Sequence, residues 1–321
     1  MKAIVQDRYG SAEVLHARDI DKPAIGDNEV LVRVHAASIH VGDWILMTGS
    51  PFIMRLATGL RKPNIRVPGT DIAGTVEAVG KDVTQLRAGD EVFGWVAGAF
   101  AEYATATEDQ FVKKPANLTF EEAASVGVSA TTALQLLRDN GNVKPGQKVL
   151  INGASGGVGT FAVQIAKALG AEVTGVSSTT NLEMVRSIGA DHVIDYTRED
   201  FTRSPLRYDL IIDNAGNHSL IALRRVLAPT GTFVMVGAPK GNWIAPIARI
   251  VGARVLSAFG GRRMLAHLTD TTQDDLIELR EYIEAGKVTP VIDRRYPLRE
   301  VPDAIRYLET LRARGKVIIT F

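Results

Sequence analysis

The sequence predicts an α/β fold with a β-rich first part, followed by a doubly wound parallel sheet covered by helices on both faces. Before about residue 120, short β-type runs alternate with turns that contain Gly, Pro and Asp, a spacing typical of a barrel or sandwich. After this point, apolar strand-like runs alternate with amphipathic helical runs, which is typical of a parallel sheet. The 30 glycines among the 321 residues gather between apolar runs, as tight strand–helix turns favour.

The β-rich part is expected to contain short strands and one helical insertion. Strands are predicted at 30–36, at 72–79, at 88–94 (a turn entering a strand) and from 101 onwards. Residues 51–62 mix apolar and basic side chains and are interpreted as a short helix or flap. A helix rich in Ala and Leu is predicted over 121–137, with Thr119 as its N-cap and Glu122 at the spacing of a capping box.

The parallel sheet is expected to be built from alternating strands and helices. Its strands are predicted at 148–152, 172–177, 192–195, 210–214, 232–236 and 255–259, with helices at 157–169, 182–188 and 219–227. The tail is predicted as a helix at 273–285 ended by Gly286, a strand at 288–293, a helix at 301–312 with Pro302 in its first turn, and a strand at 316–321. We expect this tail to rejoin the β-rich domain, which gives one domain at 1–122 with 261–321 and the other at 123–260.

Composition excludes several classes of function. Lys and Arg (37) nearly balance Asp and Glu (36), so the net charge of +1 supports neither nucleic-acid binding nor an electrostatic membrane anchor. The absence of Cys excludes disulfides, thiolate nucleophiles, Cys-ligated zinc and iron–sulfur clusters. The sequence has neither the apolar stretch of a signal peptide nor a membrane-spanning run. We therefore expect a cytoplasmic protein.

A glycine-rich turn joins the strand at 148–152 to the helix at 157–169. It consists of Gly153-Ala154-Ser155-Gly156-Gly157-Val158-Gly159, an A-x-G-x-x-G form of the dinucleotide fingerprint. Gly156 lets the backbone approach a pyrophosphate, Gly159 lets the helix pack on the strand, and the helix N-terminus attracts the anion. The strand before the turn and the amphipathic helix after it give the required context, so we expect a Rossmann domain with residues 154–158 on the cofactor. The alternative is a tight βα turn without a ligand.

The end of the second strand of this domain favours NADP(H) as the cofactor. An NAD site usually has Asp or Glu there, whereas this chain has Val176-Ser177-Ser178-Thr179-Thr180-Asn181. The small donors Ser177, Ser178 and Asn181 suit a 2′-phosphate, although the nearest Arg is Arg186 on the next helix, and ordinary turn residues are the alternative. Further cofactor contacts, or turn residues, are expected at the ends of later strands: Tyr196, Asn214, Gly237 and Ala238.

Several segments together resemble the medium-chain dehydrogenase/reductase superfamily, and most of all its zinc-free quinone oxidoreductase branch. They are residues 68–76, 89–94, 98–103, 153–159, 164–167 and 189–196, and the resemblance covers essentially the whole chain. It implies a GroES-like β-rich catalytic domain at 1–122 and 261–321 and a Rossmann domain at 123–260. It also suggests a homodimer formed through the last strand of the Rossmann sheet, near 255–259.

The resemblance also concerns metal. Zinc-dependent relatives carry Cys where this chain has His40, Gly-His-Glu where it has Gly69-Thr70-Asp71, and a lobe with four Cys that is absent here. His40 and Asp71 alone are too few for a zinc site, which needs three protein ligands and a water. We therefore expect no metal and a reaction that needs no Lewis acid, in which a hydride passes to a quinone or an α,β-unsaturated carbonyl.

The resemblance implies roles for a few residues outside the glycine turn. His40 stands where the zinc-free branch usually has Asn beside the nicotinamide. It is expected to contact the cofactor or to donate a hydrogen bond or proton to the substrate oxygen, with a packing role as the alternative. Asp43 is expected to orient its neighbours and Thr70 to bind the nicotinamide ribose or the substrate, unless it is only a buried strand residue. The remaining expected contacts are Trp44 and Phe52 in the substrate pocket and Thr131 or Thr132 on the cofactor. The alternative for Phe52 is that residues 52–60 form an apolar surface helix packed on the barrel.

The sequence thus favours an NADPH-dependent reductase of quinones or activated alkenes, which acts on a small molecule rather than on nucleic acid or a membrane. A zinc-independent, NADP-dependent alcohol dehydrogenase or ketoreductase that activates a carbonyl through His40 is a second hypothesis. A third is a protein that binds NADPH without turnover, because a binding fold alone does not establish chemistry.

Overall fold

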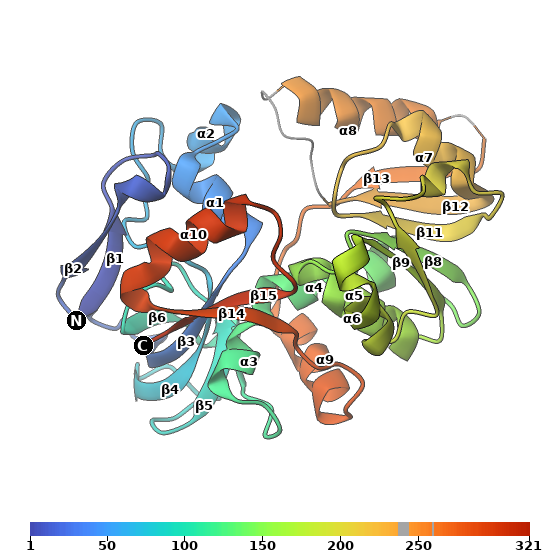
Figure 1. Cartoon of the computed structure of the whole chain (residues 1–321). Helices are drawn as coiled ribbons and strands as arrows, with labels where there is room; N and C mark the ends of the chain where they lie inside the picture. Colours follow the sequence, from blue (N-terminus) through green and yellow to red (C-terminus); the bar gives the residue numbers. More distant parts are fainter. Residues whose placement is uncertain (237–243, 259) are drawn as a thin grey trace. The chain divides into compact units, whose positions relative to one another are not determined.

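The chain folds into two compact units (Figure 1). The computed structural model describes residues 1–236, 244–258 and 260–321. The first unit comprises Met1–Thr131, Thr271–Glu284 and Pro290–Phe321, and the second comprises Thr132–Asp270 and Ala285–Thr289. The boundaries expected from the sequence, 122/123 and 260/261, fall earlier in the chain. Helix α3 (Phe120–Ala124) packs on the β-rich sheet, and strand β13 (Arg263–Ala266) belongs to the parallel sheet.

The first unit is built on a mixed sheet with the strand order β14-β15-β3-β4-β5-β7, and β6 also pairs with β3. Its strands are β3 (Glu29–Ile39), β4 (Asp71–Val79), β5 (Glu91–Trp95), β6 (Tyr103–Thr107), β7 (Phe111–Lys113), β14 (Ile292–Pro297) and β15 (Lys316–Thr320), beside a hairpin of β1 (Lys2–Gln6) and β2 (Leu15–Asp19). Because β15 pairs antiparallel with β3, the tail rejoins the β-rich domain as expected. Strand β14 begins at Ile292, later than the predicted 288, and runs beyond the predicted end at 293.

The helices of this part of the chain agree with the sequence-based predictions only in part. They are α1 (Val41–Thr48), α2 (Arg55–Thr58), α3, α4 (Gly127–Gln135), α9 (Gln273–Glu284) and α10 (Val301–Glu309). The capping box is confirmed, since Thr119 Oγ1 accepts from Glu122 N at 3.2 Å and Glu122 Oε2 accepts from Thr119 N at 2.8 Å. The helix predicted over 121–137 is interrupted, because the Ser125 hydroxyl turns back to donate to Glu122 O at 2.6 Å.

The second unit contains a parallel sheet with the strand order β10-β9-β8-β11-β12-β13. Its strands are β8 (Lys148–Asn152), β9 (Glu172–Ser177), β10 (His192–Asp195), β11 (Tyr208–Asp213), β12 (Leu227–Met235) and β13, and its helices are α5 (Gly157–Ala168), α6 (Leu182–Ser187), α7 (Leu220–Val226) and α8 (Ile244–Ser257). The strand order reverses between β8 and β11. This is the position at which such sheets bind ligands at the carboxyl ends of their strands.

The strand predicted at 255–259 is wrong. Residues 255–257 end helix α8, Phe259 lies outside the described residues, and the strand beside β12 is β13. A short apolar run such as 255–259 fits the end of a helix as well as a strand. The chain turns into β13 through Gly260 and Gly261, both at positive φ.

Both units have cores of buried aliphatic and aromatic side chains. The core of the first unit gathers around Val32, Ile72 and Ile319, and that of the second around Leu150, Ile211 and Phe233. Within the described ranges, no helix is both long enough and apolar enough to cross a lipid bilayer.

Candidate active site

The glycine turn of the second unit leaves space for a ligand. Gly153 has φ of +82°, and Gly156 is the N-cap of α5. A Cβ on Gly159 would lie 2.1 Å from Gly153 O, so packing within the protein requires glycine there. A Cβ on Gly156 would meet only Gly153 O, at an ordinary 3.6 Å. Packing therefore does not require glycine at position 156, which agrees with the predicted close approach of a pyrophosphate to the α5 N-terminus.

Asn214, at the end of β11, carries a buried amide that lacks a partner. Its Nδ2 and Oδ1 are both shielded from solvent and make no hydrogen bond to any described residue. Burying such a group unpaired costs about 1–3 kcal/mol. Asn214 follows β11, which pairs with β8 where the strand order reverses. Both halves of its amide thus fit a polar group of a dinucleotide bound at this edge.

The ends of β9 and β10 bring an Asp carboxylate and an Arg guanidinium to the place where the ribose of the cofactor is predicted to bind. Asp195 lies opposite Ser177 in the β9–β10 pairing. Its carboxylate accepts hydrogen bonds from Thr179 Oγ1 (2.5 Å) and from Thr197 N (2.9 Å) and Oγ1 (2.7 Å). The bond from Thr179, helped by those from Thr197, holds the pKa of Asp195 below its usual range. Arg198 Nε lies 3.8 Å from Asp195 Oδ2. Sequence reasoning singled out neither Asp195 nor Arg198, since only the strand pairing brings them to this edge.

The other residues predicted for this end lie around the same loops. Asn181 Nδ2 donates to Ser155 Oγ at 3.2 Å, which ties the end of β9 to the glycine turn. Ser178 shares a hydrogen bond with Thr180, and Tyr196 is 54% exposed. Tyr196 and the residues that follow it line a hollow of about 270 Å³ with Asn217 and His218. Gly237 and Ala238 lie outside the described residues.

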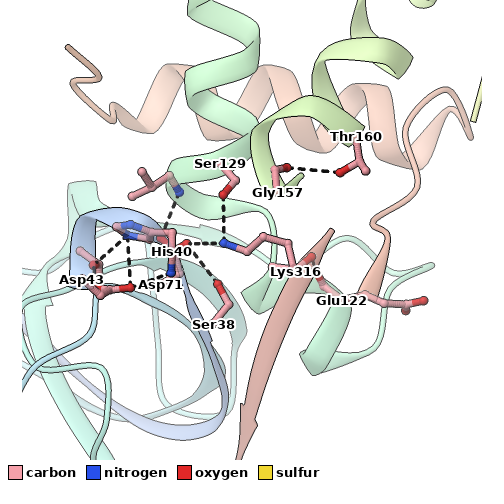
Figure 2. Close-up of polar contacts among 12 residues, drawn as sticks. Ser38, His40, Asp43, Asp71, Glu122, Ser129, Gly157, Thr160 and Lys316 are labelled. Atoms are coloured by element: carbon pink, nitrogen blue, oxygen red, sulfur yellow. Dashed lines mark hydrogen bonds and ion pairs between the residues drawn. The ribbon is translucent and has the colours of Figure 1, made fainter. Parts of the chain in front are cut away.

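In the first unit, the three predicted catalytic residues form one hydrogen-bonded cluster. Figure 2 shows two of them, His40 and Asp43, close together. Thr70 Oγ1 donates to Asp43 Oδ1 at 2.6 Å, and His40 Nε2 lies 3.0 Å from Thr70 Oγ1. Because the single hydroxyl hydrogen of Thr70 is used on Asp43, His40 Nε2 donates to Thr70. Asp43 Oδ2 also accepts from His40 N at 2.9 Å. A Cβ on Gly42 would lie 2.7 Å from His40 Nδ1, so Gly42, which sequence reasoning missed, makes room for the imidazole.

Asp71, the other residue considered for zinc, belongs to a separate buried ion pair in the first unit. Lys316 Nζ lies 3.5 Å from Asp71 Oδ2 and donates to Ser129 Oγ at 3.0 Å. Asp71 also accepts from Ser38 Oγ (3.2 Å) and Val128 N (3.0 Å). Both charged side chains are essentially inaccessible to solvent, so Asp71 is committed to this pair. Nowhere in the described part of the chain do three His, Asp or Glu side chains gather as metal ligands.

The remaining predicted residues differ in whether their side chains already have partners within the protein. Thr131 is fully buried, and its Oγ1 has no partner among the described residues. Thr132, the alternative, shares a hydrogen bond of 2.7 Å with Thr269. The choice between the two threonines as a cofactor contact stays a prediction. Trp44 donates from Nε1 to Glu309 at 2.8 Å, which fixes its indole on α10. Phe52 is 56% exposed, with the Arg55 guanidinium 4.3 Å from its ring centre.

Comparison with known proteins identifies the family. The model of the alcohol dehydrogenase GroES-like domain matches residues 26–116, and that of the zinc-binding dehydrogenase matches residues 188–319. The structure of the quinone oxidoreductase from Coxiella burnetii is 32% identical with a TM-score of 0.89, over 100% of this chain and 99% of that one. This chain belongs to the medium-chain dehydrogenase/reductase superfamily. It falls in the zinc-free, quinone oxidoreductase-like branch.

Two further relatives extend the comparison within this superfamily. The 2-methylene-furan-3-one reductase of Solanum lycopersicum is 34% identical, over 99% of this chain and 79% of that protein. The structure of the Escherichia coli quinone oxidoreductase complexed with NADPH has a TM-score of 0.85 and 26% identity, and the match covers 100% of both chains. The expected GroES-like and Rossmann architecture of a medium-chain reductase is thereby confirmed. The roles of the individual site residues stay predictions.

Proposed function

We propose that this protein transfers a hydride from NADPH to a quinone or an α,β-unsaturated carbonyl without a metal ion. Membership of the quinone oxidoreductase-like branch makes it an NAD(P)H-dependent oxidoreductase enzyme. The observation that carries the finer proposal is the His40–Thr70–Asp43 cluster, which orients the His40 imidazole but, within the described residues, has no third metal ligand. The substrate named for the tomato relative is itself an enone, which agrees with this acceptor class.

The residues of the second unit suit the cofactor, and those of the first suit the acceptor. When bound, the nicotinamide supplies the hydride. A quinone accepts this hydride and a proton to give a hydroquinone, and an enone accepts the hydride at its β-carbon and a proton at its α-carbon. In both cases negative charge develops on the acceptor oxygen, which a positioned donor stabilises.

His40 is the residue of the cluster best suited to serve that oxygen. Its Nε2 hydrogen is directed to Thr70, whose own hydrogen goes to Asp43. This chain of bonds fixes the ring and orients it. As an imidazolium, His40 carries a second hydrogen on Nδ1, which the cluster does not use. We assign this hydrogen to the acceptor oxygen, as a hydrogen bond or a transferred proton.

The test of the acceptor class is NADPH oxidation, followed by absorbance, across a panel of quinones, enones, simple ketones and secondary alcohols with a metal chelator present. We expect turnover with quinones or enones and none with simple ketones. Chelator-resistant reduction of simple ketones, or oxidation of secondary alcohols by NADP⁺, would instead favour the ketoreductase hypothesis. That alternative uses the same His40 contact on a carbonyl that is not conjugated.

We also propose that NADPH is preferred to NADH and that Arg198 contributes to the preference. Its Nε lies 3.8 Å from Asp195 Oδ2, the same oxygen that accepts from Thr179 in the Ser177–Asn181 segment. Asp195 Oδ1 accepts two further hydrogen bonds from Thr197. We expect Arg198→Ala to weaken NADPH binding about fivefold, because a charge-assisted contact to the 2′-phosphate is lost. NADH, which lacks this phosphate, should bind as before.

Fluorescence titration with both nucleotides measures this difference. The matched control is Arg203→Ala. Like that of Arg198, the Arg203 side chain is largely exposed, and its Nε lies 3.5 Å from a carboxylate oxygen, Asp200 Oδ2. Equal losses for NADPH and NADH in Arg198→Ala would remove Arg198 from the specificity site. Tighter binding of NADH than of NADPH by the unmodified protein would overturn the preference itself.

A homodimer joined through the parallel sheet completes the proposal. Within the described residues, β13 ends the strand order and pairs only with β12. This edge, rather than residues 255–259, is the one that a second copy would extend. Light scattering on the purified protein measures the mass directly.

A further inference from the structure

We propose that Arg249 is a positioning residue for the dinucleotide: it holds the loop after β11 so that the Asn214 amide stays directed at the ligand. The inference rests on the proposed nucleotide binding. It adds a residue of helix α8 that the glycine fingerprint does not include.

Arg249 ties α8 to the carboxyl ends of two strands of the sheet. Its Nη2 lies 2.9 Å from Asp213 Oδ2 at the end of β11, and its Nε lies 3.0 Å from Met235 Sδ at the end of β12. Its Nη1 donates to His218 O at 2.8 Å. The Arg249 side chain is 10% exposed and that of Asp213 is 0% exposed. One guanidinium thus joins a helix, two strand ends and the loop after β11. A lysine could not make all these contacts, because its ammonium group lacks donors in the same fixed directions.

The other oxygen of Asp213 extends this network to the glycine turn. Asp213 Oδ1 accepts from Asn152 Nδ2 at 2.8 Å and from Gly216 N at 3.0 Å. Asn152, the last residue of β8, also donates from Nδ2 to Asn217 Oδ1 at 2.9 Å. Gly216 has φ of +64°, which glycine adopts without strain. The network therefore runs from α8 through β11 to the residue just before Gly153.

This network fixes the 214–218 loop at three points: Gly216 N, the Asn217 side chain and His218 O. Asn214 is the first residue of the loop, and its amide is buried without a described partner. A loose loop would let this amide turn to water, and binding would then have to order it again. Arg249 removes that ordering cost in advance, because preorganised groups lose less entropy on binding.

The first test is a double-mutant cycle between Arg249→Met and Asn214→Ala, read as the NADPH dissociation constant from fluorescence. We expect each single variant to weaken binding about tenfold. The double variant should bind no more weakly than the worse single variant, because both remove the same contact. Additive losses would overturn the proposal, since Arg249 would then act independently of Asn214. Should Arg249→Met not fold, Arg249→Lys takes its place in the cycle.

The second readout needs no nucleotide. Amide hydrogen exchange of residues 214–218 in the free protein should speed up in Arg249→Met. It should remain unchanged in Arg254→Met, because Arg254 is exposed on the same helix. Ser257→Ala controls for loosening of α8 in general, since Ser257 Oγ bonds Met264 N at 2.6 Å and Met264 O at 3.0 Å, away from the loop. If Ser257→Ala weakened NADPH binding as much as Arg249→Met does, the role of Arg249 would be merely structural.

These outcomes separate this inference from the proposed function. If the unmodified protein bound neither NADPH nor NADH, the proposed function would fail, and this inference would lose its basis with it. If it bound NADPH and reduced quinones while the cycle was additive or exchange in the loop was unchanged, only the role of Arg249 would fail.

Discussion

Replacing His40 by Ala is expected to lower kcat about 100-fold, the contribution typical of a positioned proton donor. The imidazole is held by Thr70 through Nε2, and Thr70 by Asp43. Alanine removes the imidazole, and with it the Nδ1 hydrogen of the imidazolium that we assign to the acceptor oxygen. NADPH affinity should change little, because the glycine turn carries most of that binding. Steady-state kinetics with a quinone, together with a fluorescence titration of NADPH, separate the two effects.

His35→Gln is the matched control for this prediction. His35 lies on β3, and its Nε2 is 3.0 Å from Thr75 Oγ1, outside the cluster. Glutamine keeps a polar group near Thr75, and turnover should be unaffected. If His40→Ala kept its kcat within about threefold of the unmodified enzyme, the role of His40 would be packing, the alternative that the sequence left open.

Replacing Lys316 by Met is expected to lower the free energy of unfolding by about 3–5 kcal/mol, because it leaves a buried carboxylate without its counter-charge. Lys316 and Asp71 are 1% and 0% exposed, and their ion pair links β15 to β4, while the bond to Ser129 reaches α4. Methionine fills similar space but carries no donor. Chemical denaturation of the two proteins at neutral pH gives the difference directly.

The double variant Lys316→Met with Asp71→Asn provides the control for the charge. The amide oxygen can still accept from Val128 N, and the amide nitrogen can donate to the Ser38 hydroxyl, so most of the lost stability should return. If the double variant were as unstable as Lys316→Met alone, lost packing rather than an unpaired charge would explain the effect. A loss below about 1 kcal/mol in Lys316→Met would show that the pair contributes no more than a surface ion pair.

Local signals in the sequence were sufficient for much of the parallel sheet. Strands β8, β9 and β10 begin and end where they were expected, since each is a short apolar run bounded by polar or glycine-rich turns. The capping box at Thr119 is equally local, because all its atoms lie within four residues. The last strand could not be placed in this way, because a short apolar run such as 255–259 does not distinguish a strand from the end of a helix.

The site itself was predictable only where a motif or the family resemblance carried the information. The fingerprint gave the turn, and the resemblance gave His40, Asp43 and Thr70, which the fold brings together. Asp195 reaches Thr179 only through the pairing of β10 with β9, and Arg249 reaches Asp213 only because α8 packs on the sheet. Such pairings are long-range, and no spacing within a single segment encodes them.

A crystal structure of the protein grown with NADPH tests most directly whether the glycine turn holds the cofactor. We expect the pyrophosphate over Gly156 and Gly157 at the start of α5, and a polar group of the nucleotide within hydrogen-bond distance of the Asn214 amide. Nucleotide density at another place, with the turn empty at saturating NADPH, would contradict the proposed binding mode and the metal-free reduction that depends on it.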